Sequence, residues 1–258
     1  MLALARRDVH LWVASYDDVA HELQAAYLTL LNEEERQNQQ RFYFERDRLR
    51  YLVTRALVRS VLSRYAPIAP EEWRFATNSY GRPHIAGAPT AASDIRFNLS
   101  HTHSLIVLGV TLGRELGVDV ENVRTRSASI QIADSFFAPE EVADLARVPV
   151  EHRQHRFFEY WTLKESYIKA RGMGLSIPLD KFSFHYRADG AVELSVCAEL
   201  EDDPCRWQFW HLQPAPGYLL AVCAERLRAE TSQLVVRRIV PGAGEEIIAP
   251  AVHRMSGP

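Results

Sequence analysis

The distribution of apolar and polar positions predicts short strands at both ends of each half of the chain, with helices between them. Alternating apolar positions predict strands at 9–14, 73–76, 95–110, around Val118, and at 182–186, 191–196, 207–212 and 218–224. A polar helical stretch covers 19–40, and an amphipathic helix covers 46–64, ending before Pro67 and Pro70. Because the second half repeats this order of elements, the pattern predicts an α/β (α+β) protein.

A third helix is predicted over 155–171, which contains no Pro or Gly and is followed by Gly172. At about 100° per residue, Phe157, Trp161 and Ile168 form one apolar ridge, so this helix packs against a core. Glu165 and Lys169 project from the edge of the ridge. Lys164 falls on the apolar side and needs an anionic partner if it is buried.

Lysine is rare, with three lysines against 27 arginines, and two of the three, Lys164 and Lys169, flank Glu165. A compact ammonium group suits a phosphate better than a planar guanidinium that needs more room. This favours a phosphate site on the helix. The alternative is an ordinary ion pair between Glu165 and Lys169 on a solvated face, worth about 0.2–0.5 kcal/mol.

The strand at 116–124 carries two acidic residues, Asp119 and Glu121, on one face. Their Cα atoms lie about 7 Å apart, so their carboxylates can meet at one hard cation. Mg²⁺ takes a few carboxylates together with waters and substrate phosphates. The alternative is the exposed polar face of an edge strand.

Polar residues interrupt the apolar run at 95–110, namely Asn98, Ser100, His101 and His103. Ser and His at a strand end can donate hydrogen bonds to a phosphate. A zinc site is rejected, since no Cys lies nearby and no H-E-x-x-H pattern exists.

Size and composition exclude several classes of protein. A chain of 258 residues that is 47% hydrophobic can bury a sizeable core. The net charge of −3 leaves no electrostatic footprint for nucleic acid. The N-terminal residues do not fit a signal peptide, and no apolar run reaches the roughly 18 residues that span a bilayer. Cys197, Cys205 and Cys223 lack C-x-x-C spacing, which favours a reducing, cytoplasmic environment without a disulfide framework.

Taken together, these segments resemble the Sfp-type 4′-phosphopantetheinyl transferases. The similarity covers about residues 10–225 and includes RFNLSH, GVDVE, FFAPEE and WTLKESYIKARGMGLSIPLDKFSF, in that order, after RFYFERDRLRYLVTRALVRSVLSRY and YGRPHI. It implies two similar lobes related by a pseudo-twofold axis, a pseudo-dimeric monomer with the site between the lobes. We expect an N-terminal lobe at 1–115, a C-terminal lobe at 116–226, and a loosely ordered extension, rich in Gly, Pro and Ala, at 227–258.

The resemblance also implies a role for each matching residue. Asp119, Glu121 and Glu165 would hold the Mg²⁺ that bridges the pyrophosphate of coenzyme A, and Glu165 would act as general base. Lys169 and Lys164 would lie against the pyrophosphate. The adenosine 3′-phosphate and neighbouring parts of the cofactor would contact Arg46, Arg50, Arg82, Ser100 and His101, while Glu141 would be an acid behind the site. Where some relatives carry two lysines, this chain has Glu35 and Asn38, so recognition of the 3′-phosphate would depend on the arginines.

The implied reaction is transfer of the phosphopantetheine arm to a serine of an apo acyl, peptidyl or aryl carrier protein. Two alternatives remain open: an Mg²⁺-dependent hydrolase of a nucleotide pyrophosphate, and an inactive relative that only binds coenzyme A or a carrier protein. The acceptor could lie against Ile130, Ile132, Phe136 and Phe137, which ordinary core packing explains equally well. Neither a nucleic acid nor a membrane is expected as a partner.

Overall fold

The computed structural model describes the whole chain except residues 18, 88, 126–129, 228–229 and 258. The helices of the described chain are α1 (His21–Leu30), α2 (Glu33–Arg41), α3 (Glu45–Leu62), α4 (Gln131–Phe136), α5 (Pro139–Arg147) and α6 (Val150–Arg171). Its strands are β1 (Asp8–Ser15), β2 (Phe75–Thr77), β3 (Pro83–Ile85), β4 (Ile95–Thr102), β5 (Leu105–Leu112), β6 (Leu116–Asn122), β7 (Phe182–Tyr186), β8 (Val192–Val196), β9 (Trp207–Gln213), β10 (Tyr218–Glu225), β11 (Gln233–Val240), β12 (Gly244–Ile248) and β13 (Ala251–Met255).

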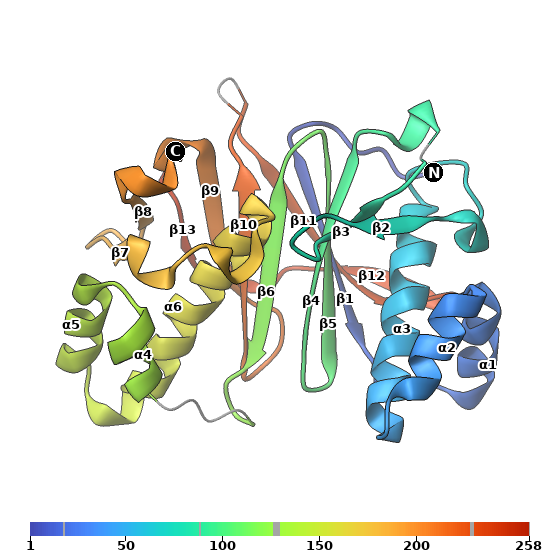
Figure 1. Cartoon of the computed structure of the whole chain (residues 1–258), viewed down its shortest axis with the longest axis horizontal. Helices are drawn as coiled ribbons and strands as arrows, with labels where there is room; N and C mark the ends of the chain where they lie inside the picture. The colour runs from blue at the N-terminus through green and yellow to red at the C-terminus, as the bar shows by residue number, and fades with distance from the viewer. Residues whose placement is uncertain (18, 88, 126–129, 228–229, 258) are drawn as a thin grey trace.

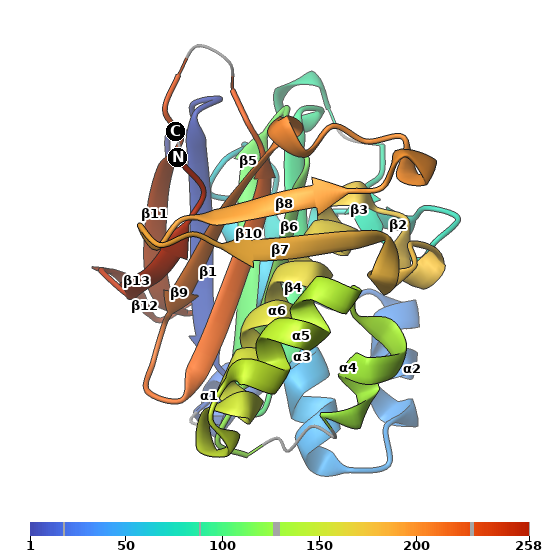
Figure 2. The ribbon, with the colours of Figure 1, turned by 90° about the vertical axis from the view of Figure 1, so that its left-hand side faces the viewer.

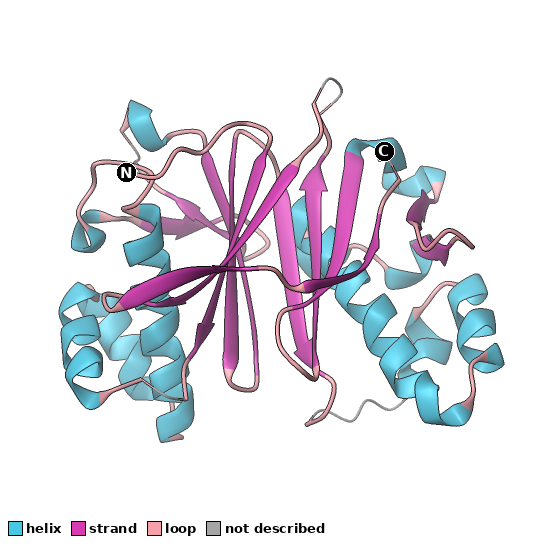
Figure 3. Ribbon diagram, turned by 180° about the vertical axis from the view of Figure 1, so that it is seen from behind, coloured by secondary structure: helices cyan, strands magenta, loops and turns pink. Residues whose placement is uncertain are grey.

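Two sheets stand at the centre of the molecule, and the helices cover their two outer sides (Figures 1 and 3). The strand orders are β12-β11-β1-β5-β4 and β13-β9-β10-β6. The orders β1-β5-β4 and β6-β10-β9 correspond, and in each half the helices and a small hairpin, β2–β3 or β7–β8, follow the first of these strands. Figure 2 shows the second of these hairpins beside α5 and α6. The chain thus forms the two similar α/β lobes that were predicted.

The core consists of three layers of buried apolar side chains, one of which joins the two lobes. One layer lies between the first sheet and α1–α3, one between the second sheet and α4–α6, and one between the two sheets. Along β1, Val9, Leu11 and Val13 belong to the layer between the sheets, whereas Trp12 and Ala14 face the helices. Because both faces are buried, the central strands carry almost continuous apolar runs.

The helices agree with the predicted pattern in two places and differ in a third. The helix α6 ends at Gly172, which adopts the left-handed conformation with φ of 68°, as predicted, and α3 matches the amphipathic helix. The stretch 19–40 forms two helices because Asn32 caps the second of them, accepting a bond of 2.8 Å from the N–H of Glu35. No helix among the described residues combines the length and apolar character needed to cross a bilayer.

Residues 95–110 form two antiparallel strands rather than one. They fold back through a turn at His103 and Ser104, where Ser104 has φ of 68°. The polar residues that interrupt the apolar run therefore mark the end of β4.

The expectation of a loosely ordered extension at 227–258 is wrong. The strand β11 pairs in parallel with β1, from Asp8 opposite Gln233 to Val13 opposite Arg238, and β12 pairs with β11. The strand β13 pairs with β9 in the other sheet. The last strands thus extend both sheets, because each finds an edge whose N–H and C=O groups need partners.

Candidate active site between the lobes

The two lobes meet where the edge strands β4 and β6 lie side by side. Three polar side chains on β4 accept the hydrogen bonds from β6 that backbone carbonyl groups would accept in a continuous sheet. Asn98 Oδ1, Ser100 Oγ and Thr102 Oγ1 accept hydrogen bonds from the N–H groups of Val118, Val120 and Asn122, at 2.9, 3.2 and 3.2 Å. Every second residue of each strand points to the same side, so these bonds recur at every second residue. This seam between β4 and β6 places Ser100 beside Asp119.

The helix α6 packs on the same seam because Gly117 has no side chain. A Cβ atom at this position would lie 1.9 Å from the carbonyl oxygen of Ser166 in α6. The absence of a side chain lets the backbones of β6 and α6 approach closely. The close approach brings Lys169, one turn after Glu165, over the strand that carries Asp119.

Lys169, Asp119 and Ser100 form one hydrogen-bonded group at this junction. Lys169 Nζ lies 2.6 Å from Asp119 Oδ1 and 3.1 Å from Ser100 Oγ, and Ser100 Oγ donates to Asp119 Oδ1 at 2.9 Å. The second oxygen of Asp119, Oδ2, is buried and has no hydrogen-bond partner among the described residues. This oxygen can therefore accept a further ligand.

The group lines a cavity of about 500 Å³, which we call the central cavity. Arg50 and Arg55 of α3 enter it from the N-terminal lobe and Lys169 from the C-terminal lobe. Of the described residues that line it, only Asp119 bears a carboxylate. The excess of positive charge favours a phosphate-bearing ligand.

His101 also lines the central cavity. Although part of its side chain reaches solvent, burial lowers the pKa of its ring, and the positive charge of Arg50 lowers it further. His101 is thus neutral at pH 7, and a bound phosphate would favour its protonated form.

The three predicted magnesium ligands do not form a ready-made set. Glu121 is buried and accepts a bond of 3.3 Å from Thr102 Oγ1, and Glu165 is half-buried on α6. Among the described residues, no three His, Cys, Asp or Glu side chains are grouped as metal ligands. The free Oδ2 of Asp119 fits a hard cation, and Mg²⁺ needs only one or two carboxylates when phosphates and waters supply the rest. The ligand set stays a prediction.

Lys164 lies on the opposite face of α6, away from the central cavity, which corrects the prediction that it contacts the pyrophosphate. Its ammonium is fully buried, 2.7 Å from Glu141 Oε2, and donates to the carbonyl oxygens of Leu179 and Phe182 at 2.7 and 2.6 Å. Glu141 is thus the anionic partner that a buried Lys164 needs. Burial lowers the pKa of Lys164 and raises that of Glu141, and the attraction between them opposes both shifts.

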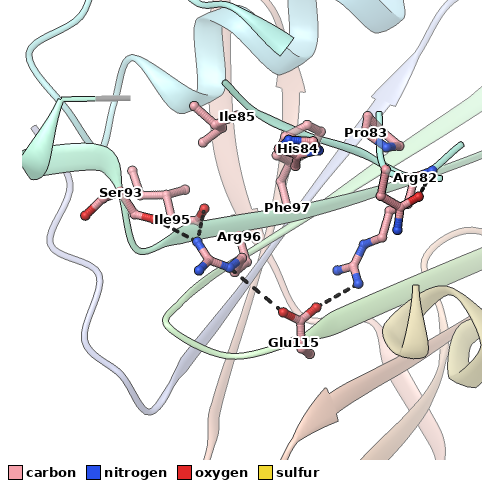
Figure 4. A pocket seen from close by; sticks show the side chains of 10 residues that line it. Arg82, Pro83, His84, Ile85, Ser93, Ile95, Arg96, Phe97 and Glu115 are labelled. Carbon is pink, nitrogen blue, oxygen red and sulfur yellow. Dashed lines mark hydrogen bonds and ion pairs between the residues drawn. The ribbon is translucent and has the colours of Figure 1, made fainter. Parts of the chain in front are cut away.

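The other predicted residues occupy different places. Arg46 donates to the hydroxyl of Tyr16 at 3.2 Å and lines a separate surface hollow. Glu35 is buried, with Arg59 Nη2 2.7 Å from its carboxylate, and Asn38 accepts a bond from Arg41. Arg82 binds Glu115 and lines a different cavity (Figure 4).

Sequence reasoning missed Arg55, which faces the central cavity beside Arg50. Its guanidinium lies 5.2 Å from the ring centre of Tyr51, one turn earlier, and 3.5 Å from Glu35. The i, i+4 pair of Tyr51 and Arg55 was the available signal, but many exposed helix faces carry such pairs.

Family models match both halves of the chain. Residues 14–112 match a model described as 4′-phosphopantetheinyl transferase, N-terminal, and residues 115–223 match the 4′-phosphopantetheinyl transferase superfamily. The chain is 35% identical over 208 residues to 4′-phosphopantetheinyl transferase Sfp of Bacillus subtilis (strain 168), covering 80% of this chain and 87% of that protein. It is 38% identical over 222 residues to 4′-phosphopantetheinyl transferase HetI of Nostoc sp. (strain PCC 7120), covering 86% and 89%. The chain belongs to the 4′-phosphopantetheinyl transferase superfamily.

Proposed function

We propose that this protein transfers the 4′-phosphopantetheine arm of coenzyme A to a serine hydroxyl of an apo carrier protein and releases 3′,5′-ADP. The observation that carries the proposal is the central cavity, where Lys169, Asp119 and Ser100 meet at the seam between the lobes. Both lobes contribute cations to this cavity, which suits a cosubstrate with several phosphates. The membership of the family supports the same reaction.

The cations of the cavity would bind two different groups of coenzyme A, the pyrophosphate and the 3′-phosphate. Lys169, paired with Asp119, would neutralise the pyrophosphate. Arg50 and Arg55 would face the 3′-phosphate of the adenosine, with His101 as a hydrogen-bonding neighbour. Arg55 compensates for the lysines that Glu35 and Asn38 replace.

In the transfer, the serine oxygen of the carrier protein forms a bond to the phosphorus that bears the pantetheine arm. The bond from that phosphorus to the oxygen of 3′,5′-ADP breaks, and the leaving phosphate takes the negative charge. Lys169 lies where it would stabilise this charge, and Glu165 would accept the serine proton. Asp119, Glu121 and Glu165 would hold Mg²⁺, which supplies further charge neutralisation at the pyrophosphate.

The acceptor is an acyl, peptidyl or aryl carrier protein. The enzyme binds it as a monomer with two lobes, and the reaction takes place in the cytoplasm. Ile132 and Phe136 on α4 are 40% and 54% exposed and could contact it, whereas Phe137 is buried against Phe157. The free thiols of Cys197, Cys205 and Cys223 support a reducing compartment.

A panel of apo carrier proteins, incubated with coenzyme A and Mg²⁺, tests the reaction by the mass added to the acceptor. We expect wild-type protein to add the phosphopantetheine arm. Glu165→Gln should bind coenzyme A in calorimetry but lose transfer, because an amide cannot accept the serine proton.

Two results would contradict this proposal. Release of phosphopantetheine without any acceptor would identify a hydrolase. Binding of coenzyme A by the wild type without transfer to any member of the panel would identify an inactive relative. A third result, transfer at the wild-type rate by Glu165→Gln, would leave the reaction in place and remove only this residue from the role of base.

A further inference from the structure

The turn between β2 and β3 belongs to the N-terminal lobe but reaches the end of α6 in the other lobe. Asn78 organises this turn: its Oδ1 accepts hydrogen bonds from the N–H groups of Tyr80 and Arg82, at 3.0 and 2.9 Å. Its Nδ2 donates to the carbonyl oxygen of Gly172 at 2.8 Å. One amide thus shapes the turn and joins it to the residue that ends α6.

Arg82 makes a second connection from the same turn. Its Nη1 donates to the carbonyl oxygen of Ala170 at 3.0 Å, and its Nη2 to that of Leu116 at 3.1 Å. Its Nη1 also lies 2.7 Å from Glu115 Oε2, a contact visible in Figure 4. The planar guanidinium therefore holds the end of α6 and the start of β6 at once.

The contact fits the chemistry of a helix end. The last carbonyl groups of a helix have no partner within the helix and carry its partial negative charge. Arg82 supplies both a donor and a positive charge there. A Cβ atom on Gly172 would lie 2.9 Å from Arg82 Nη1, so the glycine leaves room for the guanidinium.

The direction of Arg82 separates it from the central cavity. Its neighbours Gly81 and Pro83 line the central cavity, whereas Arg82 and Arg96 line a second cavity of about 380 Å³ on the side of Glu115 (Figure 4). The side chain of Arg82 is only 17% exposed. Its hydrogen-bonding groups are directed at protein rather than at the cosubstrate site.

We infer that Arg82 and Asn78 are positioning residues, which fix the end of α6 against the N-terminal lobe and so place Lys169, the residue before Ala170, over Asp119 and Ser100. This inference rests on the proposed function. It replaces the expectation that Arg82 contacts the 3′-phosphate. A cavity with cations from both lobes requires the lobes to keep a fixed register, because displacement of a catalytic group by about 1 Å can cost on the order of 10²-fold in rate.

Transfer from coenzyme A and from 3′-dephospho-coenzyme A tests the inference, because the two differ only in the 3′-phosphate. We expect Arg82→Ala to lower kcat by roughly 10- to 10²-fold with both cosubstrates, at nearly unchanged KM and with the wild-type preference for coenzyme A retained. The kcat of Arg82→Lys should stay low as well, because an ammonium keeps the positive charge but not the two parallel donors of the guanidinium.

Asn78→Asp provides a second variant, should Arg82→Ala fail to fold. The carboxylate keeps the acceptor that shapes the turn but loses the donor to Gly172, so kcat should again fall with preference retained. Arg96→Ala is the matched control: Arg96 lies 3.9 Å from Glu115 and otherwise binds the carbonyl groups of Ser93 and Ile95 in its own lobe. Its kcat should stay within about twofold of wild type. Circular dichroism at the assay temperature shows the folded fraction of each variant.

A selective loss of the preference for coenzyme A in Arg82→Ala, restored by Arg82→Lys, would overturn the positioning role and return Arg82 to the 3′-phosphate. Unchanged kcat in both Arg82→Ala and Asn78→Asp would also overturn it. Wild-type protein that transfers from neither cosubstrate would instead overturn the proposed function itself.

Discussion

The two faces of α6 carry lysines five residues apart that serve different purposes. Lys164 is fully buried, and its ammonium is surrounded by Glu141 and two backbone carbonyl oxygens. Lys169 is 26% exposed, pairs with Asp119 and faces the central cavity. Both are compact ammonium groups beside a carboxylate.

The two lysines differ in whether their surroundings leave room for a ligand. Lys164 has a complete set of protein acceptors, so a ligand could reach it only after the core opened. In the group around Lys169, one oxygen, Asp119 Oδ2, has no hydrogen-bond partner in the described part of the chain, and the group opens to solvent through the cavity. A closed structural ion pair and a pair open to a ligand are thus distinguished by their surroundings rather than by residue type.

The largest effect is expected on the buried face. Lys164→Met should lower the free energy of unfolding by about 3–5 kcal/mol, because the buried carboxylate of Glu141 loses its counter-charge. Adding Glu141→Gln should recover part of this loss, since the amide is uncharged and its oxygen can still accept from the backbone N–H of Phe184. Urea unfolding measures both variants. A stable Lys164→Met protein with impaired transfer would break the comparison by giving Lys164 a role in catalysis.

On the open face, activity rather than stability should change. Lys169→Ala should lower kcat by roughly 10²-fold or more, the scale for removing one preorganised donor to a developing charge. Its unfolding free energy should fall by less than that of Lys164→Met, because Asp119 keeps the hydrogen bond from Ser100 and water from the cavity can take the place of the ammonium. Single-turnover transfer and urea unfolding provide the two readings.

Two further lysine variants sharpen this result. Lys169→Arg should restore little activity, because a planar fork does not fit the position of an ammonium. Lys181→Ala is the matched control, since the third lysine pairs at the surface with Glu199, and it should leave both quantities unchanged. Full activity of Lys169→Arg would contradict the argument from ammonium geometry.

A smaller effect should appear in the pH dependence of stability. His211 of β9 contacts Thr162 on the buried side of α6. Burial, together with the smaller effects of His253, Arg254 and His155, lowers its pKa to about 3. The folded protein therefore keeps His211 neutral, while the unfolded chain binds a proton below its ordinary pKa of about 6.5. Stability should fall as the pH drops below 6.5, by up to about 1.4 kcal/mol per pH unit from this residue.

Urea unfolding at pH 7, 6 and 5 measures this slope. His211→Gln, which cannot titrate, should flatten it, and the contribution of His10, whose pKa burial lowers to about 4, should remain. An unchanged slope in His211→Gln would place the proton uptake elsewhere.

Local signals in the sequence predicted the helices α3 and α6 and most of the central strands. Gly172 marked the end of α6 because only a residue that tolerates positive φ stops a helix in this way. The helical wheel also showed that Lys164 would need an anion. It could not identify Glu141, which α5 brings to Lys164 from an earlier segment of the chain.

The candidate site followed from the resemblance, whereas its assembly did not follow from local pattern. The hydrogen bonds that Asn98, Ser100 and Thr102 accept from the backbone of β6 depend on two strands that belong to different sheets. The strands β11, β12 and β13 were all missed. The last two carry little apolar alternation, and all three form by pairing with existing edges. The seam and the last strands both depend on contacts between distant segments, which the periodicity of apolar residues does not predict.

The pairing of β1 with β11 has a consequence for how the protein is made. Asp8 pairs with Gln233, so one edge of β1 stays open until β11 has left the ribosome. At about 5–20 residues per second, that interval lasts roughly 10 to 45 s. An unpaired strand edge can recruit another chain during such a delay, and so distant a contact forms slowly. Both sheets are therefore completed only by the last strands, the first by β11 and β12 and the second by β13. Of the two edges that wait for these strands, the edge of β1 stays open longer than that of β9.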